Sequence, residues 1–174
     1  MGYLEIYNAA LVVAWLAVLV NPDYLIPVQV VNLVLELVHI AAGLVRAPLL
    51  AALMQCYARL GMCLGVLWNQ KQWAPEWAFR AMIFAWGITE VIRYTYYLVK
   101  RGTWLRYLAF IVLYPLGLIS EATIAWSVLP HVTHWFQKWF LYVGFAMYLP
   151  GFVMLYSYMW KQRRKQLGPK KKQI

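Results

Sequence analysis

Six long runs of apolar residues divide the chain, and short stretches with turn-forming or charged residues separate them. Each run has about 20 residues, the length at which a helix rising about 1.5 Å per residue crosses roughly 30 Å of hydrocarbon. The separators contain proline, glycine, asparagine or clustered basic residues, which end helices or favour turns. The pattern therefore predicts an all-α integral membrane protein, a six-helix transmembrane bundle, with spans at about 3–20, 27–45, 48–68, 77–99, 104–128 and 135–159.

The composition supports a membrane location. Of the 174 residues, 64% are hydrophobic and 13% are charged, whereas soluble domains have roughly half apolar and a quarter charged residues. The aromatic fraction of 17% suits a protein with many helix ends, because Trp and Tyr side chains settle at the level of the lipid headgroups. We expect a single transmembrane domain at 1–160, built from the six spans.

The basic residues are distributed unevenly, which predicts the orientation. Six spans place both termini on one side, which carries eleven Lys and Arg residues against three on the other. Because basic residues concentrate on the cytosolic side, we expect cytosolic termini. The net charge of +10 is then explained by topology and by attraction to anionic lipids rather than by nucleic acid. The basic tail, 161–174, ends in Lys171-Lys172-Gln173-Ile174, which resembles the dilysine signal for return to the endoplasmic reticulum, or is simply a solvated end.

Six ionisable residues fall inside the predicted spans, where a charged side chain costs at least about 2.5 kcal/mol. They are Glu36, His39, Arg59, Glu90, Arg93 and Glu121. Helical spacing places Glu36 with His39, Glu90 with Arg93, and Gln55 with Arg59 on common faces, so these pairs could neutralise or hydrogen-bond each other. Such residues either hold the bundle together through contacts between helices or line a polar site.

Tyr114 and Glu121 in the fifth predicted span are seven residues apart, so they share one helix face at heights about 10 Å apart. Pro115 removes a backbone hydrogen bond, and we expect a kink there, with Gly117 and Ser120 allowing close approach and satisfying freed carbonyls. A carboxyl group in an apolar pocket can donate a proton, and a phenol can donate a hydrogen bond or, beside a cation, act as a base. The pair therefore suits general acid-base catalysis.

Several other classes of site lack support in the sequence. Three histidines are too few for the histidine boxes of membrane desaturases, and no P-loop, dinucleotide fingerprint or serine elbow is present. Cys56 and Cys63 have neither zinc spacing nor a disulfide framework, so we expect buried, inert thiols. A Tyr/Glu pair needs no metal and no other cofactor for proton transfer.

Three segments carry a resemblance to a known family. In this order and spacing, "WGITEVIRYTYY" at 86–97, "RYLAFIVLYPLGLISE" at 106–121 and "LPHV" at 129–132 resemble the 3-hydroxyacyl-CoA dehydratase family of very-long-chain fatty acid elongation, also called protein tyrosine phosphatase-like. The similarity extends over almost the whole chain. The loop between the fifth and sixth spans is shorter here than is usual in the family.

The resemblance implies a hydro-lyase of the endoplasmic reticulum membrane that converts (3R)-3-hydroxyacyl-CoA to trans-2-enoyl-CoA. The family's catalytic pair falls on Tyr114 and Glu121; we expect Tyr114 to be the base and Glu121 the acid, although the sequence leaves these roles interchangeable. The expected partners are the very-long-chain acyl-CoA substrate, membrane lipid and other elongation enzymes. Expected supporting or pocket residues are Glu90, Arg93, Tyr94, Arg59 and Gln55, and candidates for the mouth that binds the CoA phosphates are Lys100, Arg101 and Arg106.

Two other functions remain compatible with the sequence. A small transporter or channel could use Glu36, Glu90 and Glu121 as a relay. Transporters often contain internal repeats, but the second and fourth spans share only an acid followed three residues later by a base. A non-catalytic membrane scaffold of the same fold is the other alternative, and the presence of both Tyr114 and Glu121 argues against it.

Overall fold

The computed structural model describes residues 2–45, 49–101 and 103–167, which form helices and connecting turns without a strand in these ranges. Because α3, η2 and α4 follow one another without a break, the described chain makes six helical rods. The elements are α1 (Tyr3–Val20), η1 (Pro22–Tyr24), α2 (Leu25–Ala41), α3 (Leu49–Leu60), the π-helical η2 (Gly61–Leu67), α4 (Trp68–Gln70), η3 (Lys71–Trp73), α5 (Glu76–Val99), α6 (Thr103–Val128), η4 (Leu129–His131) and α7 (Trp135–Leu167).

Three rods are long and apolar enough to cross a membrane, namely Tyr3–Val20, Pro22–Ala41 and Leu108–His131. A fourth candidate is α7, whose segments Trp135–Tyr148 and Pro150–Arg164 meet at a bend of 40°. The all-helical prediction is confirmed, and the length and composition of the helices support three or four membrane spans rather than all six. The remaining two rods, α3 to α4 and α5, carry Arg59 and the pair of Glu90 and Arg93 respectively, and these charged residues lower their hydropathy.

The helix ends agree closely with the predicted spans at four of the six rods, and the two differences have local causes. α2 ends at Ala41, earlier than predicted, because the chain turns through Gly43 at a φ of 70°, a conformation that glycine adopts without strain. α7 continues to Leu167, so part of the predicted tail is helical. Basic side chains are favourable at a helix C-terminus, where the unpaired carbonyls lie. The dilysine-like end at 171–174 lies outside the described residues.

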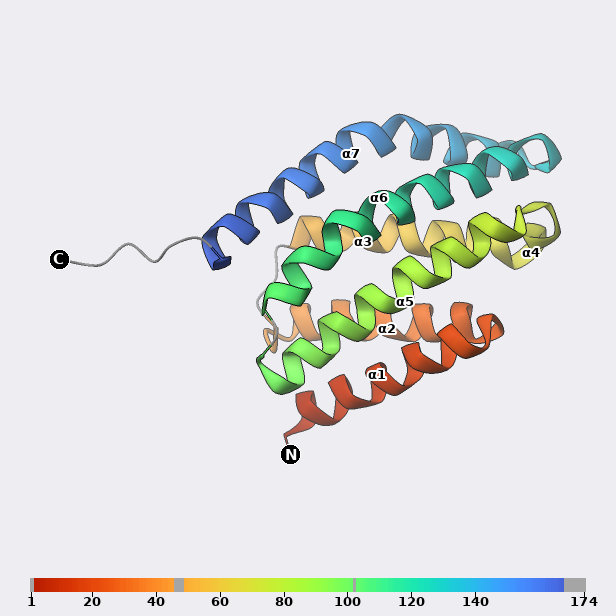
Figure 1. Ribbon diagram of the computed structural model, residues 1–174. Coiled ribbons are helices and arrows are strands. Elements are labelled where there is room, and N and C mark those ends of the chain that lie inside the picture. Colours follow the sequence, from red (N-terminus) through yellow and green to blue (C-terminus); the bar gives the residue numbers. More distant parts are fainter. Residues whose placement is uncertain (1, 46–48, 102, 168–174) are drawn as a thin grey trace.

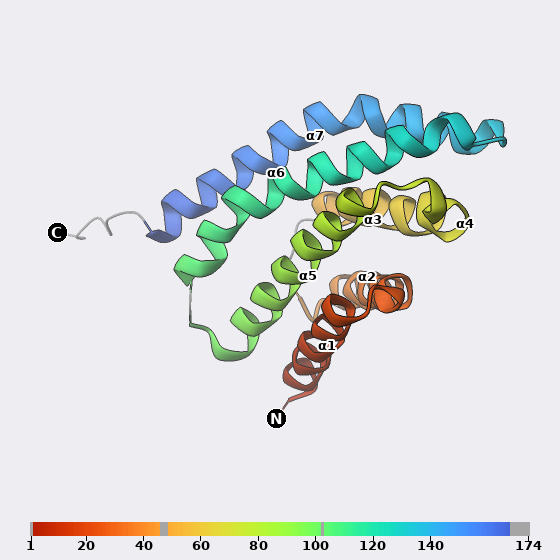
Figure 2. The ribbon, with the colours of Figure 1, turned by 45° about the vertical axis from the view of Figure 1, so that its right-hand side comes forward.

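The rods form two layers. α1, α5, α6 and α7 lie side by side in that order, and α2 and the α3–α4 rod lie behind them (Figures 1 and 2). α5 is central, since it packs most extensively against α1 and α6. α1 begins and α7 ends at the same end of the bundle, as an even number of rods requires (Figure 1).

An apolar core fills the end of the bundle away from the start of α1. Trp15, Met82 and Ile124 are fully buried there, from α1, α5 and α6 respectively. α1 and α5 approach closely at Gly87, where a Cβ atom would lie only 2.6 Å from Cδ2 of Leu19. Any larger residue would force the Leu19 side chain to shift, so glycine allows the first helix to lie this close to the central one. Both cysteines are buried and free, as predicted.

α6 runs through Pro115 as one continuous helix, so the expected kink does not interrupt it. A bend of 40° lies before Pro150 in α7. The hydroxyl of Ser120 donates to the carbonyls of Leu116 and Gly117, each at 2.8 Å, and not to the carbonyl of Ile111 that Pro115 frees. The predicted role of Ser120 in satisfying that carbonyl is therefore wrong, because a serine in a helix reaches only the carbonyls three and four residues before it.

Candidate functional site

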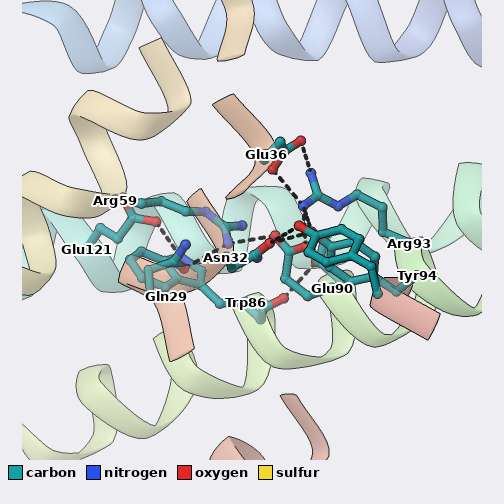
Figure 3. Close-up of polar contacts among 12 residues, drawn as sticks. Gln29, Asn32, Glu36, Arg59, Trp86, Glu90, Arg93, Tyr94 and Glu121 are labelled. Carbon is teal, nitrogen blue, oxygen red and sulfur yellow. Dashed lines mark hydrogen bonds and ion pairs between the residues drawn. The ribbon is translucent and has the colours of Figure 1, made fainter. Parts of the chain in front are cut away.

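A network of paired charges crosses the interior between α2, α3 and α5 (Figure 3). Arg59 Nη1 donates to Oε1 of Glu90 at 2.7 Å and to Oε1 of Gln29 at 3.2 Å. Arg93 Nη2 lies 2.8 Å from Oε2 of Glu90, and the Arg93 guanidinium also binds both oxygens of Glu36, at 3.1 and 3.0 Å. Two cations thus neutralise two carboxylates in the interior of the bundle, which removes most of the cost of burying each charge alone.

Uncharged groups extend this network to α1. Arg93 Nη2 donates to the hydroxyl of Tyr94 at 2.6 Å, and that hydroxyl donates to Oδ1 of Asn32. The hydroxyl of Tyr7 reaches the same oxygen at 3.4 Å. Tyr94 and Asn32 are buried, so their hydrogen bonds fix the relative positions of α1, α2 and α5.

Several predicted pairs within one helix give way to partners on other helices. The pair of Glu90 and Arg93 is confirmed. Glu36, however, binds Arg93 instead of His39, whose ring nitrogen lies 2.8 Å from the hydroxyl of Tyr3. Arg59 likewise binds residues of α2 and α5 rather than Gln55. Charged partners across the interior outcompete the neutral amide one turn away, because an ion pair buried from water is stronger than a hydrogen bond to a neutral group.

A second polar centre surrounds Glu121 of α6. The indole nitrogen of Trp86 on α5 donates to Oε1 of Glu121 at 2.7 Å, and the hydroxyl of Tyr148 on α7 donates to Oε2 at 3.5 Å. The guanidinium of Arg59 lies over the Trp86 ring, 4.7 Å from its centroid. Glu121 therefore accepts bonds from two neighbouring helices, and the Trp86 ring joins this centre to the charged network (Figure 3).

Tyr114 lies seven residues before Glu121 on α6, in a row of aromatic rings from α7. Its ring stacks against those of Phe152, with centroids 5.5 Å apart, and Tyr156, at 6.2 Å. Helical side chains lean toward the N-terminus of their helix, and Glu121 does so, because a Cβ atom at Gly117 would lie only 3.8 Å from its Oε1. The carboxyl group thus reaches about one turn toward Tyr114, which shortens the axial gap between the two functional groups.

The basic residues expected to bind the CoA phosphates lie where α5 leads into α6. Lys100 caps the C-terminus of α5 in a left-handed conformation, with a φ of 53°, and Arg101 follows it. Both are exposed, and the side chain of Arg106 is outside the described part of the chain. From the start of α6, Tyr114 lies about 15 Å deeper by the helical rise of its residues.

The sequence did not single out several of the polar partners, namely Gln29, Asn32, Trp86 and Tyr148. A signal for two of them exists, because Trp86 lies four residues before Glu90, and Asn32 four residues before Glu36, on the same helix faces. Tyr148 could be found only as the first of the aromatic residues spaced four apart along α7. Two pockets among the described residues lie beside Lys71 and Phe79, and Glu121 lines neither of them.

Comparison with known proteins assigns the family. The family model described as protein tyrosine phosphatase-like protein, PTPLA, matches residues 30–169. The chain is 33% identical over 160 residues to the very-long-chain (3R)-3-hydroxyacyl-CoA dehydratase PASTICCINO 2A of Oryza sativa subsp. japonica, covering 79% of this chain and 72% of the relative. It is 32% identical over 163 residues to PASTICCINO 2 of Arabidopsis thaliana, which carries the same enzyme name, covering 80% and 74%.

A human relative, very-long-chain (3R)-3-hydroxyacyl-CoA dehydratase 2 of Homo sapiens, is 30% identical over 209 residues, covering 96% of this chain and 81% of the relative. That alignment is longer than the 174 residues of the chain, so the human relative carries segments that this chain lacks. No solved structure matches. On the extent of these matches, the chain belongs to the protein tyrosine phosphatase-like family, PTPLA.

Proposed function

We propose that this protein removes water from very-long-chain (3R)-3-hydroxyacyl-CoA to give trans-2-enoyl-CoA, as a lyase of fatty acid elongation. The observation that carries the proposal is the family membership, because the relatives are named for this reaction. The placement of a carboxyl group and a phenol on one face of α6, inside an apolar bundle, supplies side chains suited to that chemistry.

The reaction needs two groups that exchange protons with neighbouring carbon and oxygen atoms. A base takes a proton from carbon 2, the electron pair of that bond forms the double bond to carbon 3, and the 3-hydroxyl leaves as water after an acid protonates it. We assign Tyr114 to carbon 2 and Glu121 to the 3-hydroxyl. The donors of Trp86 and Tyr148 support this assignment, because both would stabilise the carboxylate that remains after Glu121 gives up its proton.

The remaining polar residues would support the site rather than react. Arg59, Glu90, Arg93 and Tyr94 tie the helices around the centre, with Gln55 beside Arg59 as a further pocket residue. Because Glu90 forms ion pairs with both Arg59 and Arg93, it becomes feasible for α5 and the α3–α4 rod to cross the membrane as well. We therefore propose a six-span bundle in the endoplasmic reticulum membrane with cytosolic termini.

The basic cluster would bind the substrate at the cytosolic end of this bundle. Lys100 and Arg101, with Arg106, would hold the phosphates of CoA. The acyl chain would lie among apolar side chains and membrane lipid, and other elongation enzymes would supply the hydroxyacyl substrate and consume the enoyl product. The relay hypothesis for a transporter gains no support, because Glu36 and Glu90 are both bound by guanidinium groups.

An assay of the purified protein with 3-hydroxyacyl-CoAs of graded chain length tests the proposal. Enoyl-CoA formation is expected with the long substrates, and Tyr114→Phe and Glu121→Gln are each expected to lower kcat by about 10²–10⁴-fold, the usual contribution of a general acid or base. Circular dichroism would check that the variants remain helical. Tyr142→Phe on the exposed face of α7 and Glu76→Gln at the exposed start of α5 are matched controls. Full activity of both site variants would contradict the assignment of the site.

A further inference from the structure

The two oxygens of the Glu121 carboxyl group are held unequally. Trp86 is 3% exposed, and its indole nitrogen can only donate a hydrogen bond. It reaches Oε1 of Glu121 at 2.7 Å, whereas Tyr148 reaches Oε2 only at 3.5 Å. As long as the Trp86 indole donates its hydrogen bond, Oε1 serves as the acceptor, so an exchangeable proton of this carboxyl group belongs on Oε2.

The Trp86 ring is held on its face and along its edge. The Arg59 guanidinium covers the ring face at 4.7 Å and is itself tied to Glu90 at 2.7 Å. On the side of α6 the ring meets the backbone at Gly117, where a Cβ atom would lie 3.9 Å from Cδ1 of Trp86. A cation over an indole ring attracts its electrons, and linked polar groups in a medium of low dielectric constant polarise one another. The indole N–H is therefore fixed in direction and strengthened as a donor.

We propose that Trp86 is a positioning residue for the dehydration: its N–H holds Oε1 of Glu121 and directs proton exchange with the 3-hydroxyl of the substrate to Oε2. This inference rests on the proposed function of Glu121. In the step, the bond between Oε2 and its proton breaks and the proton passes to the hydroxyl oxygen. The C3–O bond breaks with its electron pair leaving in water, while the proton on carbon 2 passes to the oxygen of Tyr114, the assigned base, and the electron pair of the C2–H bond forms the double bond. Trp86 stabilises the resulting carboxylate without touching the substrate.

The substitution Trp86→Phe tests the role of the N–H, because phenylalanine keeps an aromatic face for Arg59 and removes the donor. We expect kcat to fall about 10- to 100-fold, the equivalent of one hydrogen bond to a charged group. KM is expected to stay within about 2-fold, because the indole makes no contact with substrate in the proposed step. In protein labelled with ¹⁵N-tryptophan, the indole signal that disappears in Trp86→Phe should shift in Glu121→Gln.

Trp15→Phe is the matched control. Trp15 is fully buried in the same core, and its indole nitrogen has no hydrogen-bond partner in the described part of the chain. The same atoms are therefore removed without loss of a bond, and kcat should be unchanged. Equal losses of kcat in Trp15→Phe and Trp86→Phe would mean that packing, and not the N–H, matters, and would overturn the proposal.

Further results separate this proposal from the proposed function. If Glu121→Gln is inactive while Trp86→Phe keeps the wild-type kcat, the positioning role is wrong and the function of Glu121 stands. If Glu121→Gln is fully active, the catalytic role of Glu121 fails and the role of Trp86 fails with it. If the unchanged protein forms no enoyl-CoA, the proposed function itself fails. Tyr148→Phe gives a test that does not depend on whether Trp86→Phe folds. It removes the longer hydrogen bond, 3.5 Å at Oε2, and should lower kcat less than 10-fold. A larger loss would identify Oε2 as the held oxygen.

Discussion

Glu90→Gln is expected to destabilise the protein strongly, because Glu90 is the carboxylate shared by the two arginines of the interior. Its side chain is 1% exposed and lies 2.7 Å from Arg59 and 2.8 Å from Arg93. Glutamine has nearly the same volume and keeps one acceptor oxygen, so the change removes the negative charge and little packing. What remains is an excess positive charge in a largely buried region.

The size of the effect follows from what each arginine retains. Arg93 keeps its bidentate contact with Glu36, at 3.1 and 3.0 Å, so its charge stays paired. Arg59, whose side chain is 11% exposed, keeps only the neutral oxygen of Gln29 and the face of Trp86. Loss of one partner of a buried ion pair costs about 3–5 kcal/mol, and the surviving pair of Arg93 places the expected loss near the lower value, about 3 kcal/mol.

Unfolding in mixed detergent micelles, followed by circular dichroism as the fraction of denaturing detergent rises, measures this loss. The control is Glu76→Gln, which breaks a pair with Arg80 whose side chains are 72% and 76% exposed. An exposed pair four residues apart on a helix contributes only about 0.3–0.5 kcal/mol. If the free energies of unfolding of Glu90→Gln and Glu76→Gln differ by less than about 1 kcal/mol, the buried network contributes no more to stability than an exposed ion pair.

Two other substitutions can be compared in the same unfolding measurement. Gly87→Ala places a Cβ atom 2.6 Å from Cδ2 of Leu19 and should lower the free energy of unfolding by about 1–3 kcal/mol. Gly144→Ala, with nothing within 4 Å of the added atom, should instead raise it by about 0.5–1 kcal/mol. Equal effects of the two substitutions would contradict the close approach of α1 and α5. Tyr94→Phe removes the hydroxyl that donates to Asn32 and should cost about 1–3 kcal/mol, the penalty for a poorly satisfied buried acceptor. An unchanged unfolding midpoint would show that this hydroxyl contributes nothing.

Much of the fold could be predicted because the signals are local. The first predicted span coincides with α1, and the predicted starts and ends of the fourth and fifth spans lie within one residue of α5 and α6. Apolar runs interrupted by turn residues depend only on neighbouring residues and on the thickness of the hydrocarbon. The pair of Glu90 and Arg93 could be predicted for the same reason, since their spacing is one turn of a single helix.

By itself, the sequence determined an all-helical membrane protein, a family, and a carboxyl group and a phenol on one face of the helix that contains Pro115. Only the tertiary structure decided which partners the polar side chains have. Arg59 binds Glu90 rather than Gln55, and Glu121 accepts hydrogen bonds from Trp86 and Tyr148 on two other helices. The physical reason is that helical periodicity gives the face of a residue but not the neighbour across the interface. That neighbour is chosen by the rotation and depth of each helix, which the packing of the whole bundle determines.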